Sequence, residues 1–150
     1  MNILAIDTSN FALGVALLQD DIITGEYVTN IKKNHSVRAM PAVEQLMKEC
    51  GLKPGDLDKI VVAKGPGSYT GVRIGVTLAK TLAWTLGIPL SGVSSLQVLA
   101  ANGKYFNGVV SPVFDARRGQ IYTGLYTGDN GAVAMIKEDR ILQSTDWAEQ

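Results

Sequence analysis

The sequence predicts an α/β fold made of two related units. Three short apolar strands (residues 2–6, 12–18 and 22–28) are joined by tight turns, which is typical of an antiparallel meander. Helical and strand patterns then alternate along the chain, and a similar set of strands restarts at Val109. Because similar patterns that return after about one hundred residues indicate duplication, we expect two lobes, at residues 1–103 and 104–150.

Composition limits the classes of protein that fit. The chain has 150 residues, is 46% hydrophobic and has no net charge, which suits one globular domain or two small lobes. Without a basic excess it lacks the electrostatic footprint of a stand-alone nucleic-acid binder. A single cysteine, Cys50, excludes an internal disulfide framework. The sequence has no signal-peptide pattern and no apolar run long enough to span a membrane, so we expect a cytoplasmic protein.

A glycine-rich stretch, Lys64-Gly-Pro-Gly-Ser-Tyr-Thr-Gly-Val-Arg-Ile-Gly75, lies between an apolar strand at 60–63 and a helix that ends at Gly87. This layout is typical of anion-binding turns, where helix N–H groups point outward. Its spacing, however, matches neither the Walker A loop nor the dinucleotide fingerprint. The sequence therefore favours a tight turn capped by Ser68 or Thr70 over a phosphate site.

Two helices carry broad apolar faces. In the helix that follows the glycine-rich stretch, apolar residues cover more than half of the circumference, against a usual stripe of about 100°. We therefore expect it to be buried on two sides, by its own sheet and by either more of the chain or a second protein. Gly71 and Gly75 either admit another helix or pack on the chain's own core. A helix over 37–50, with Pro41 making its start irregular or late, has an apolar stripe of Met40, Val43, Met47 and Cys50.

Polar residues at strand ends are the candidates for chemistry. Asp7 ends the first strand of one unit, and Asp115 ends the first strand of the other. Asp7 serves either turn hydrogen bonding or contact with a phosphate-bound metal or water. His35 is the single histidine, so the chain cannot supply the ligand cluster of a zinc or iron site. We expect no metal site, and we expect His35 to act as a capping or hydrogen-bonding residue.

The duplicated unit with an acidic turn resembles the actin-like ATPase (ribonuclease H-like) fold of sugar kinases, Hsp70 and actin. Four stretches resemble the TsaB (YeaZ) family of bacterial tRNA threonylcarbamoyladenosine biosynthesis: Ile6-Asp-Thr-Ser9, His35-Ser36, Gly65-Pro-Gly-Ser-Tyr-Thr-Gly-Val-Arg73 and Phe114-Asp-Ala-Arg-Arg-Gly119. The resemblance covers essentially the whole chain, and the third stretch is its most specific part. Family members usually continue further, so we expect the second lobe to be incomplete at Gln150.

The resemblance implies a non-catalytic scaffold subunit. TsaB-like proteins partner TsaD, which transfers a threonylcarbamoyl group to the adenosine beside the tRNA anticodon and whose relatives carry a histidine pair for a metal. A chain with one histidine cannot form that pair. The implied partners are TsaD in a heterodimer, the ATPase TsaE, and a second copy when TsaD is absent, with tRNA reached only through the complex. No tightly bound cofactor is implied, and ATP or ADP with magnesium would bind only weakly or in the complex.

The resemblance also implies site residues. The partner or dimer interface would comprise Met40, Val43, Met47, Gly71, Ile74, Gly75 and Leu78. Arg73 would anchor the turn formed by Gly65, Gly67, Ser68 and Thr70, or bind a partner carboxylate. Asp7, Ser9, Asp115 and Arg117 would form a nucleotide or partner site between the lobes.

An enzyme is the alternative hypothesis. An actin-like ATPase or small-molecule kinase would use Asp7 and Asp115 around a magnesium-bound triphosphate, since magnesium needs few protein ligands. The turn from Gly65 to Gly71 would then hold the phosphates. A peptidase is the least favoured class, because no nucleophile–base pair is evident.

Overall fold

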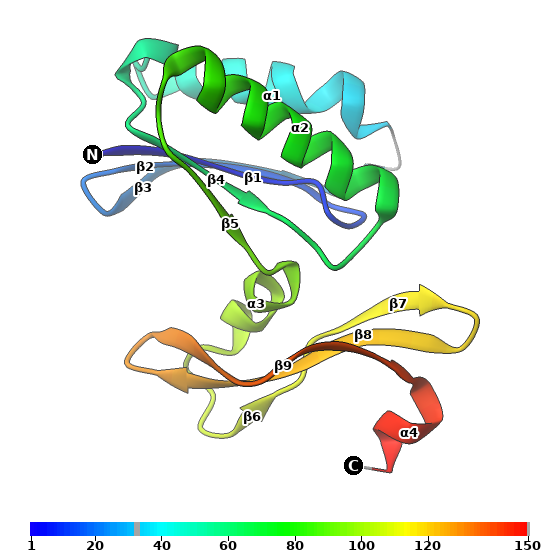
Figure 1. Ribbon diagram of the computed structural model, residues 1–150. Coiled ribbons are helices and arrows are strands. Elements are labelled where there is room, and N and C mark those ends of the chain that lie inside the picture. Colours follow the sequence, from blue (N-terminus) through cyan, green and yellow to red (C-terminus); the bar gives the residue numbers. More distant parts are fainter. Residues whose placement is uncertain (32–33, 150) are drawn as a thin grey trace. The chain divides into compact units, whose positions relative to one another are not determined.

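The computed structural model describes residues 1–31 and 34–149 (Figure 1). The chain divides into two compact units, one formed by Met1–Lys64 with Ser68–Val93, the other by Gly65–Gly67 with the residues from Ser94 onward. We expected the boundary at residue 103, and this is wrong for helix α3 (Ser95–Ala100). Leu96 and Ala100 of α3 are fully buried with Tyr126 in the core of the second unit, and burial decides to which unit a short helix belongs.

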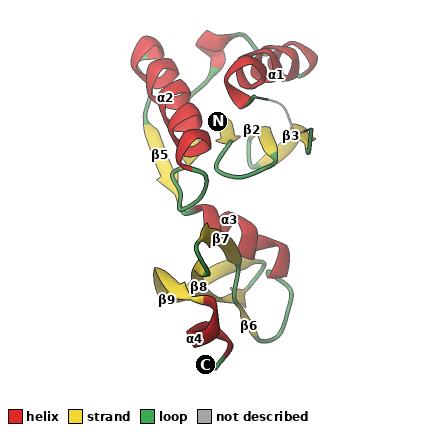
Figure 2. Ribbon diagram, turned by 90° about the vertical axis from the view of Figure 1, so that its right-hand side faces the viewer, coloured by secondary structure: helices red, strands yellow, loops and turns green. Residues whose placement is uncertain are grey.

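The first unit is a five-stranded sheet with the order β3-β2-β1-β4-β5. Its strands are β1 (Asn2–Asp7), β2 (Leu13–Gln19), β3 (Ile22–Thr29), β4 (Lys59–Ala63) and β5 (Leu90–Val93). The first three form the predicted antiparallel meander, whereas β4 and β5 run parallel to β1. Helices α1 (His35–Glu49) and α2 (Tyr69–Leu86) make the two crossovers and lie on the same face of the sheet (Figures 1 and 2).

The core of the first unit lies between the sheet and these two helices. Alternate strand residues such as Leu4, Ile6 and Ile60 are buried against the helices, as the two-residue period of a strand requires. Helix α2 faces the sheet with small residues at every fourth position, namely Gly71, Gly75, Ala79 and Ala83. This face, together with α1 beside it, accounts for much of the broad apolar sector of α2.

Local signals set the ends of both helices. The Asn34 side chain accepts a hydrogen bond from the Ser36 N–H (3.1 Å) and caps α1, which begins at His35. The predicted late or irregular start at Pro41 is wrong. Val37 and Pro41 are both exposed, so water can solvate the carbonyl group that loses its partner there. Helix α2 ends where predicted, at Gly87, which adopts the left-handed conformation with φ 67°.

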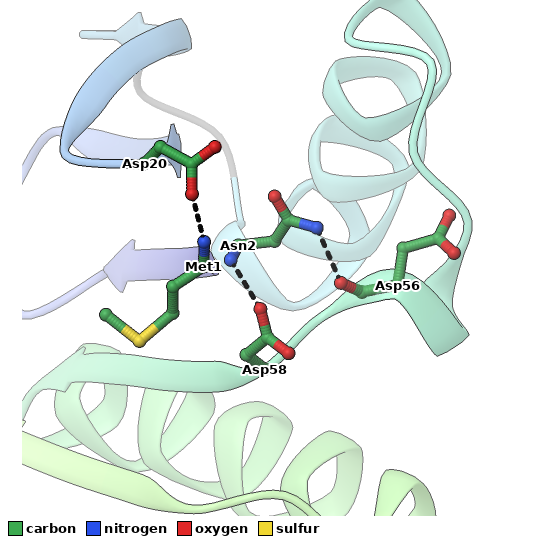
Figure 3. A network of polar contacts seen from close by, with 5 residues as sticks. All are labelled: Met1, Asn2, Asp20, Asp56 and Asp58. Carbon is green, nitrogen blue, oxygen red and sulfur yellow. Dashed lines mark hydrogen bonds and ion pairs between the residues drawn. The ribbon is translucent and has the colours of Figure 1, made fainter.

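Polar contacts hold the start of β1 to its neighbours (Figure 3). The Met1 amino group pairs with Asp20, and this contact raises the pKa of the amino group and lowers that of the carboxyl group. The Asn2 N–H donates to Asp58 Oδ2 (2.7 Å), and the Asn2 side-chain amide donates to the Asp56 carbonyl (2.7 Å). The β2–β3 turn and the segment before β4 are thereby joined to the same strand end.

The second unit also contains a meander. After α3, a 3-10 turn at Ala101–Gly103 leads to β6 (Val109–Val110), β7 (Val113–Arg117), β8 (Gln120–Asp129), β9 (Ala132–Gln143) and α4 (Ser144–Ala148). Strand β8 pairs antiparallel with β6 and β7 on one edge and with β9 on the other. None of the helices in the described residues is long and apolar enough to cross a membrane.

Two strand predictions in this unit need correction. The predicted single strand at 109–114 is split into β6 and β7, because Pro112 has no N–H to donate to the ladder. The strand predicted at 132–136 extends to Gln143. Its second half contains Lys137, Glu138, Asp139 and Arg140, and charged residues of this kind are frequent on edge strands; they hide the apolar alternation that would have revealed the full length.

A partly buried polar network supports the small core of the second unit. The Tyr126 hydroxyl and the Ser94 hydroxyl both donate to the carboxylate of Asp139 on β9. Ser94 Oγ also accepts hydrogen bonds from the N–H groups of Leu96 (3.1 Å) and Gln97 (3.2 Å), which caps α3. Burial, and the hydrogen bond to Asp139, raise the pKa of Tyr126 to about 12. The network joins α3, β8 and β9 through one carboxylate.

This raised pKa predicts alkaline unfolding of the second unit. The neutral phenol is favoured in the folded chain, so its contribution to stability is complete below the ordinary pKa of 10.0 and is lost as the pH rises from there towards about 12. Urea unfolding at stepwise pH should show this loss in the native chain and not in Tyr126→Phe. The exposed Tyr105→Phe should keep the native profile. Equal profiles for native chain and Tyr126→Phe would contradict the assignment.

Candidate functional site

The candidate site of the first unit lies at the carboxyl end of β1. Asp7 ends this strand, as predicted, and is half-buried. Its Oδ1 accepts hydrogen bonds from the Ser9 N–H (2.8 Å) and the Ser9 hydroxyl (2.6 Å). The first predicted role of Asp7, turn hydrogen bonding, is therefore confirmed.

The turn after β1 contacts the N-termini of both helices. The Ser68 N–H donates to the Ser9 carbonyl (2.7 Å), and the Thr8 hydroxyl donates to the Gly71 carbonyl (2.7 Å). At the start of α1, the Nε2 atom of His35 lies 2.9 Å from the carbonyl oxygen of Asn10. Because a carbonyl only accepts, we assign the proton to Nε2. His35 thus has the hydrogen-bonding role expected from the sequence.

The glycine-rich turn is a capped turn, as the sequence favoured. Ser68 is the N-cap of α2, and its hydroxyl accepts a hydrogen bond from the Gly71 N–H (3.3 Å). Gly65 has φ 97°, a conformation that other residues rarely adopt, and the Gly65–Pro66 peptide bond is cis. Thr70 is exposed on the first turn of the helix. Phosphate binding at this turn stays a prediction.

Gly71 and Gly75 bring α2 against the turn after β1. A Cβ atom on Gly71 would lie 2.2 Å from the Thr8 carbonyl oxygen, and one on Gly75 would lie 2.4 Å from Thr8 Oγ1. Both distances are shorter than any real contact of a Cβ atom. The two glycines are therefore required by the chain's own turn, which is the second of the two alternatives that the sequence left open.

The predicted interface residues divide into two groups. Gly71, Gly75, Val43 and Met47 are buried in the chain's own core, so the expectation that they face a partner is wrong for this fold. The apolar pattern of the sequence predicted that these residues are buried, but it could not predict whether the chain's own sheet or a partner buries them. Met40 is 41% exposed, and Ile74 and Leu78 are half-buried on α2. These three stay candidates for contact with a partner.

Sequence reasoning found Met40 but missed Val37, Tyr69 and Trp84, the most exposed apolar side chains of α1 and α2. We define the outer helix surface by Val37, Met40, Tyr69 and Trp84, of which Trp84 is 90% exposed. Trp84 falls in the polar sector of α2, and a large apolar residue in that sector was the signal that could have found this surface. Arg73 donates to the Tyr69 hydroxyl (2.9 Å) and lies over its ring. Tyr69 lies between Ser68 and Thr70, and the role of Arg73 in anchoring the turn or binding a partner carboxylate stays a prediction.

The second unit repeats the acidic turn. Asp115 Oδ1 accepts a hydrogen bond from the Arg117 N–H (2.7 Å), two residues on, as Asp7 does from Ser9. Arg117 and Arg118 have φ values of 69° and 55° and are exposed. The pairs Asp7–Ser9 and Asp115–Arg117 lie in different units. A site shared by all four residues stays a prediction.

The chemistry available at these turns is limited by their own hydrogen bonds. Thr8 and Ser9 are both 1% exposed, and each hydroxyl donates within the turn or to α2. Among residues 1–31 and 34–149, no three His, Cys, Asp or Glu side chains lie close enough to hold a metal ion. The arrangement is suited to holding β1 to α2.

Comparison with known proteins gives a consistent set of relatives. Residues 23–148 match a family model described as TsaD: tRNA N6-adenosine threonylcarbamoyltransferase. The tRNA threonylcarbamoyladenosine biosynthesis protein TsaB of Bacillus subtilis is 64% identical over 149 residues, which are 99% of this chain and 65% of the relative. TsaB of Escherichia coli is 35% identical over 89% of this chain and 58% of the relative. The chain thus spans less than two thirds of these relatives.

Solved structures agree on the fold. YeaZ from Pseudomonas aeruginosa superposes with a TM-score of 0.88 and 33% identity, over 95% of this chain and 67% of that one. Component A of (R)-2-hydroxyglutaryl-CoA dehydratase from Acidaminococcus fermentans, at 15% identity and a TM-score of 0.54, shares the fold alone, over 95% of this chain and 48% of that one. The predicted actin-like α/β fold class is confirmed.

The close approach of α2 to Thr8 predicts the effect of a single methyl group. Gly75→Ala should lower the free energy of unfolding by about 2 kcal/mol, because the added Cβ atom meets Thr8 Oγ1. Gly55→Ala, which has open space around it, should be neutral. In a Thr8→Ala background the methyl group finds room, so the cost of Gly75→Ala should fall. Urea unfolding measures the cost. If Gly75→Ala lowers the free energy of unfolding equally in both backgrounds, the added methyl group does not clash with Thr8.

Proposed function

Because this chain belongs to the TsaB (YeaZ) family, within the wider family of the TsaD model, we propose that it takes part in tRNA threonylcarbamoyladenosine biosynthesis. Its role is that of a non-catalytic subunit that binds TsaD, helps to dock the ATPase TsaE and reaches tRNA only through that complex. The observation that carries the proposal is the 64% identity to TsaB of Bacillus subtilis over 99% of this chain.

The helix layer supports a role in binding a protein. Val37 is 68% exposed, Tyr69 76% and Trp84 90%. Large aromatic side chains that are left bare on a helix are typical of protein–protein interfaces, where Trp and Tyr often dominate the binding energy. In the proposed function TsaD covers this outer helix surface, and a second copy covers it when TsaD is absent.

The turn after β1 supports a scaffold rather than a catalyst. Oδ1 of Asp7 and the hydroxyls of Thr8 and Ser9 are engaged in holding the turn and α2. Their role in holding the fold together is enough to explain why these residues stand at these positions. The proposal therefore includes no tightly bound cofactor, and ATP or ADP with magnesium binds only weakly or within the complex.

Reconstitution tests the proposed activity. Purified TsaD, TsaE, a TsaC-type enzyme, ATP, threonine, bicarbonate and tRNA should form modified adenosine only when this protein is added. The measurement is the modified nucleoside after digestion of the tRNA. Unchanged product without this protein would overturn the proposed role.

The high exposure of Trp84 on the outer helix surface predicts that this residue contributes to the binding of TsaD. Trp84→Ala should weaken binding to TsaD by at least about tenfold, because an exposed Trp at an interface typically contributes 2 kcal/mol or more. Tyr105→Ala is the matched control, since Tyr105 is 82% exposed and belongs to the second unit rather than to α1 or α2. The measurement is calorimetric titration, with light scattering for the free chain. Equal affinities for both variants would remove this surface from the interface.

A further inference from the structure

Three turns of this chain share one backbone geometry. Each joins two antiparallel strands through two residues with positive φ, which is a type I′ turn. The pairs are Asp20 and Asp21 between β2 and β3, Arg118 and Gly119 between β7 and β8, and Asn130 and Gly131 between β8 and β9. Asp, Asn and Gly are the residues that this turn favours, so two of the three turns have the expected composition.

The β7–β8 turn, at one end of the sheet of the second unit (Figure 1), is the exception. Arg118 has φ 55°, and Arg117, at the irregularity that precedes it, has φ 69°. In this conformation the Cβ atom crowds the following carbonyl oxygen, and arginine lacks the short polar side chain with which Asn or Asp compensates. Closing the hairpin therefore does not explain the two arginines, and backbone strain of this kind is often found at functional sites.

Both guanidinium groups are available to a ligand. Arg117 and Arg118 are exposed, and neither side chain has a hydrogen bond or an ion pair among residues 1–31 and 34–149. The acidic residue of the same hairpin, Asp115, accepts the Arg117 N–H at 2.7 Å through its Oδ1. Two arginines against this one carboxylate leave the tip of the hairpin positively charged, and the fold does not use that charge.

The tip is better suited to phosphate groups than to a protein surface. Residues 115–120 contain no large apolar side chain, whereas protein–protein interfaces depend on buried aromatic or aliphatic anchors. Arginine binds phosphate through two parallel N–H groups, and contacts with a nucleic-acid backbone need charge and no apolar pocket. The Gln143 side chain, which lies beside Gly119, adds a neutral donor of a kind that also contacts phosphates.

From these observations we propose that Arg117 and Arg118 bind the phosphate backbone of tRNA within the assembled complex. The inference rests on the proposed function, in which the chain reaches tRNA only through the complex, and it names the part of this chain that contacts the tRNA there. Two phosphate contacts on a chain without net charge are too few for stable binding of tRNA by the chain alone.

Salt-dependent binding of tRNA tests the proposal. In the complex with TsaD, Arg117→Asn/Arg118→Asn should bind labelled tRNA at least about tenfold more weakly than the native chain does. The slope of log affinity against log salt concentration should fall by about two, one for each lost phosphate contact. The measurement is fluorescence anisotropy, with light scattering to show that TsaD is bound equally, and ATP with magnesium is titrated in parallel.

Three controls separate contact with phosphate from an effect on folding or on net charge. Arg117→Lys/Arg118→Lys keeps both charges and should keep most of the salt slope. Lys53→Gln/Lys137→Gln removes the same charge at exposed positions outside the turn, and should bind as the native chain does. Because Asn tolerates the left-handed conformation, Arg117→Asn/Arg118→Asn should resist urea at least as well as the native chain.

The outcomes distinguish this proposal from the proposed function. Equal affinity and equal salt slope for the native chain and Arg117→Asn/Arg118→Asn would overturn the inference and leave the proposed function standing. An equal loss in Lys53→Gln/Lys137→Gln would do the same, by assigning the effect to net charge. A loss of ATP binding in place of tRNA binding would also overturn the inference, by assigning the phosphate to a nucleotide. Failure of the native chain to bind TsaD, or of their complex to bind tRNA, would overturn both.

Discussion

The structure of the first unit depends on the close approach between α2 and the turn that follows β1. Thr8 is the point of contact, because its carbonyl oxygen and hydroxyl lie where side chains of Gly71 and Gly75 would otherwise be. This approach fixes the start of α2 over the sheet, and the contacts of Ser9 with Ser68 and of Asn10 with His35 fix the rest of the turn.

One consequence is that the two sides of α2 differ completely. Small residues face the sheet, and large or charged residues face away from it. A helix that sits this close to its sheet has no room for large apolar side chains on the inner side. Tyr69 and Trp84 are then available on the outer side, where Arg73 and Lys80 accompany them. The close inner packing and the exposed aromatic side chains on the outer side are two results of the same placement.

The sequence was informative where the determinant is local. Ser68 as a cap, Gly87 as a helix end and the meander of β1 to β3 all depend on neighbouring residues, and they could be predicted. The residue that contacts Gly71 could not be predicted, since Thr8 lies 63 residues earlier in the chain. The same limit applied to Val43 and Met47, because an apolar stripe predicts burial without naming the surface that buries it. Pro112 and the charged half of β9 misled strand prediction, because hydrogen-bond geometry and edge position are not visible in periodicity.

The repeated acidic turn has a consequence for how such sequences are interpreted. Asp7 and Asp115 both accept a hydrogen bond from the N–H two residues on, so each has a local task in forming its turn. A residue with that task is needed for folding whether or not the chain carries out a reaction. Its presence in a genome sequence therefore does not distinguish an enzyme from a descendant that has kept only the architecture.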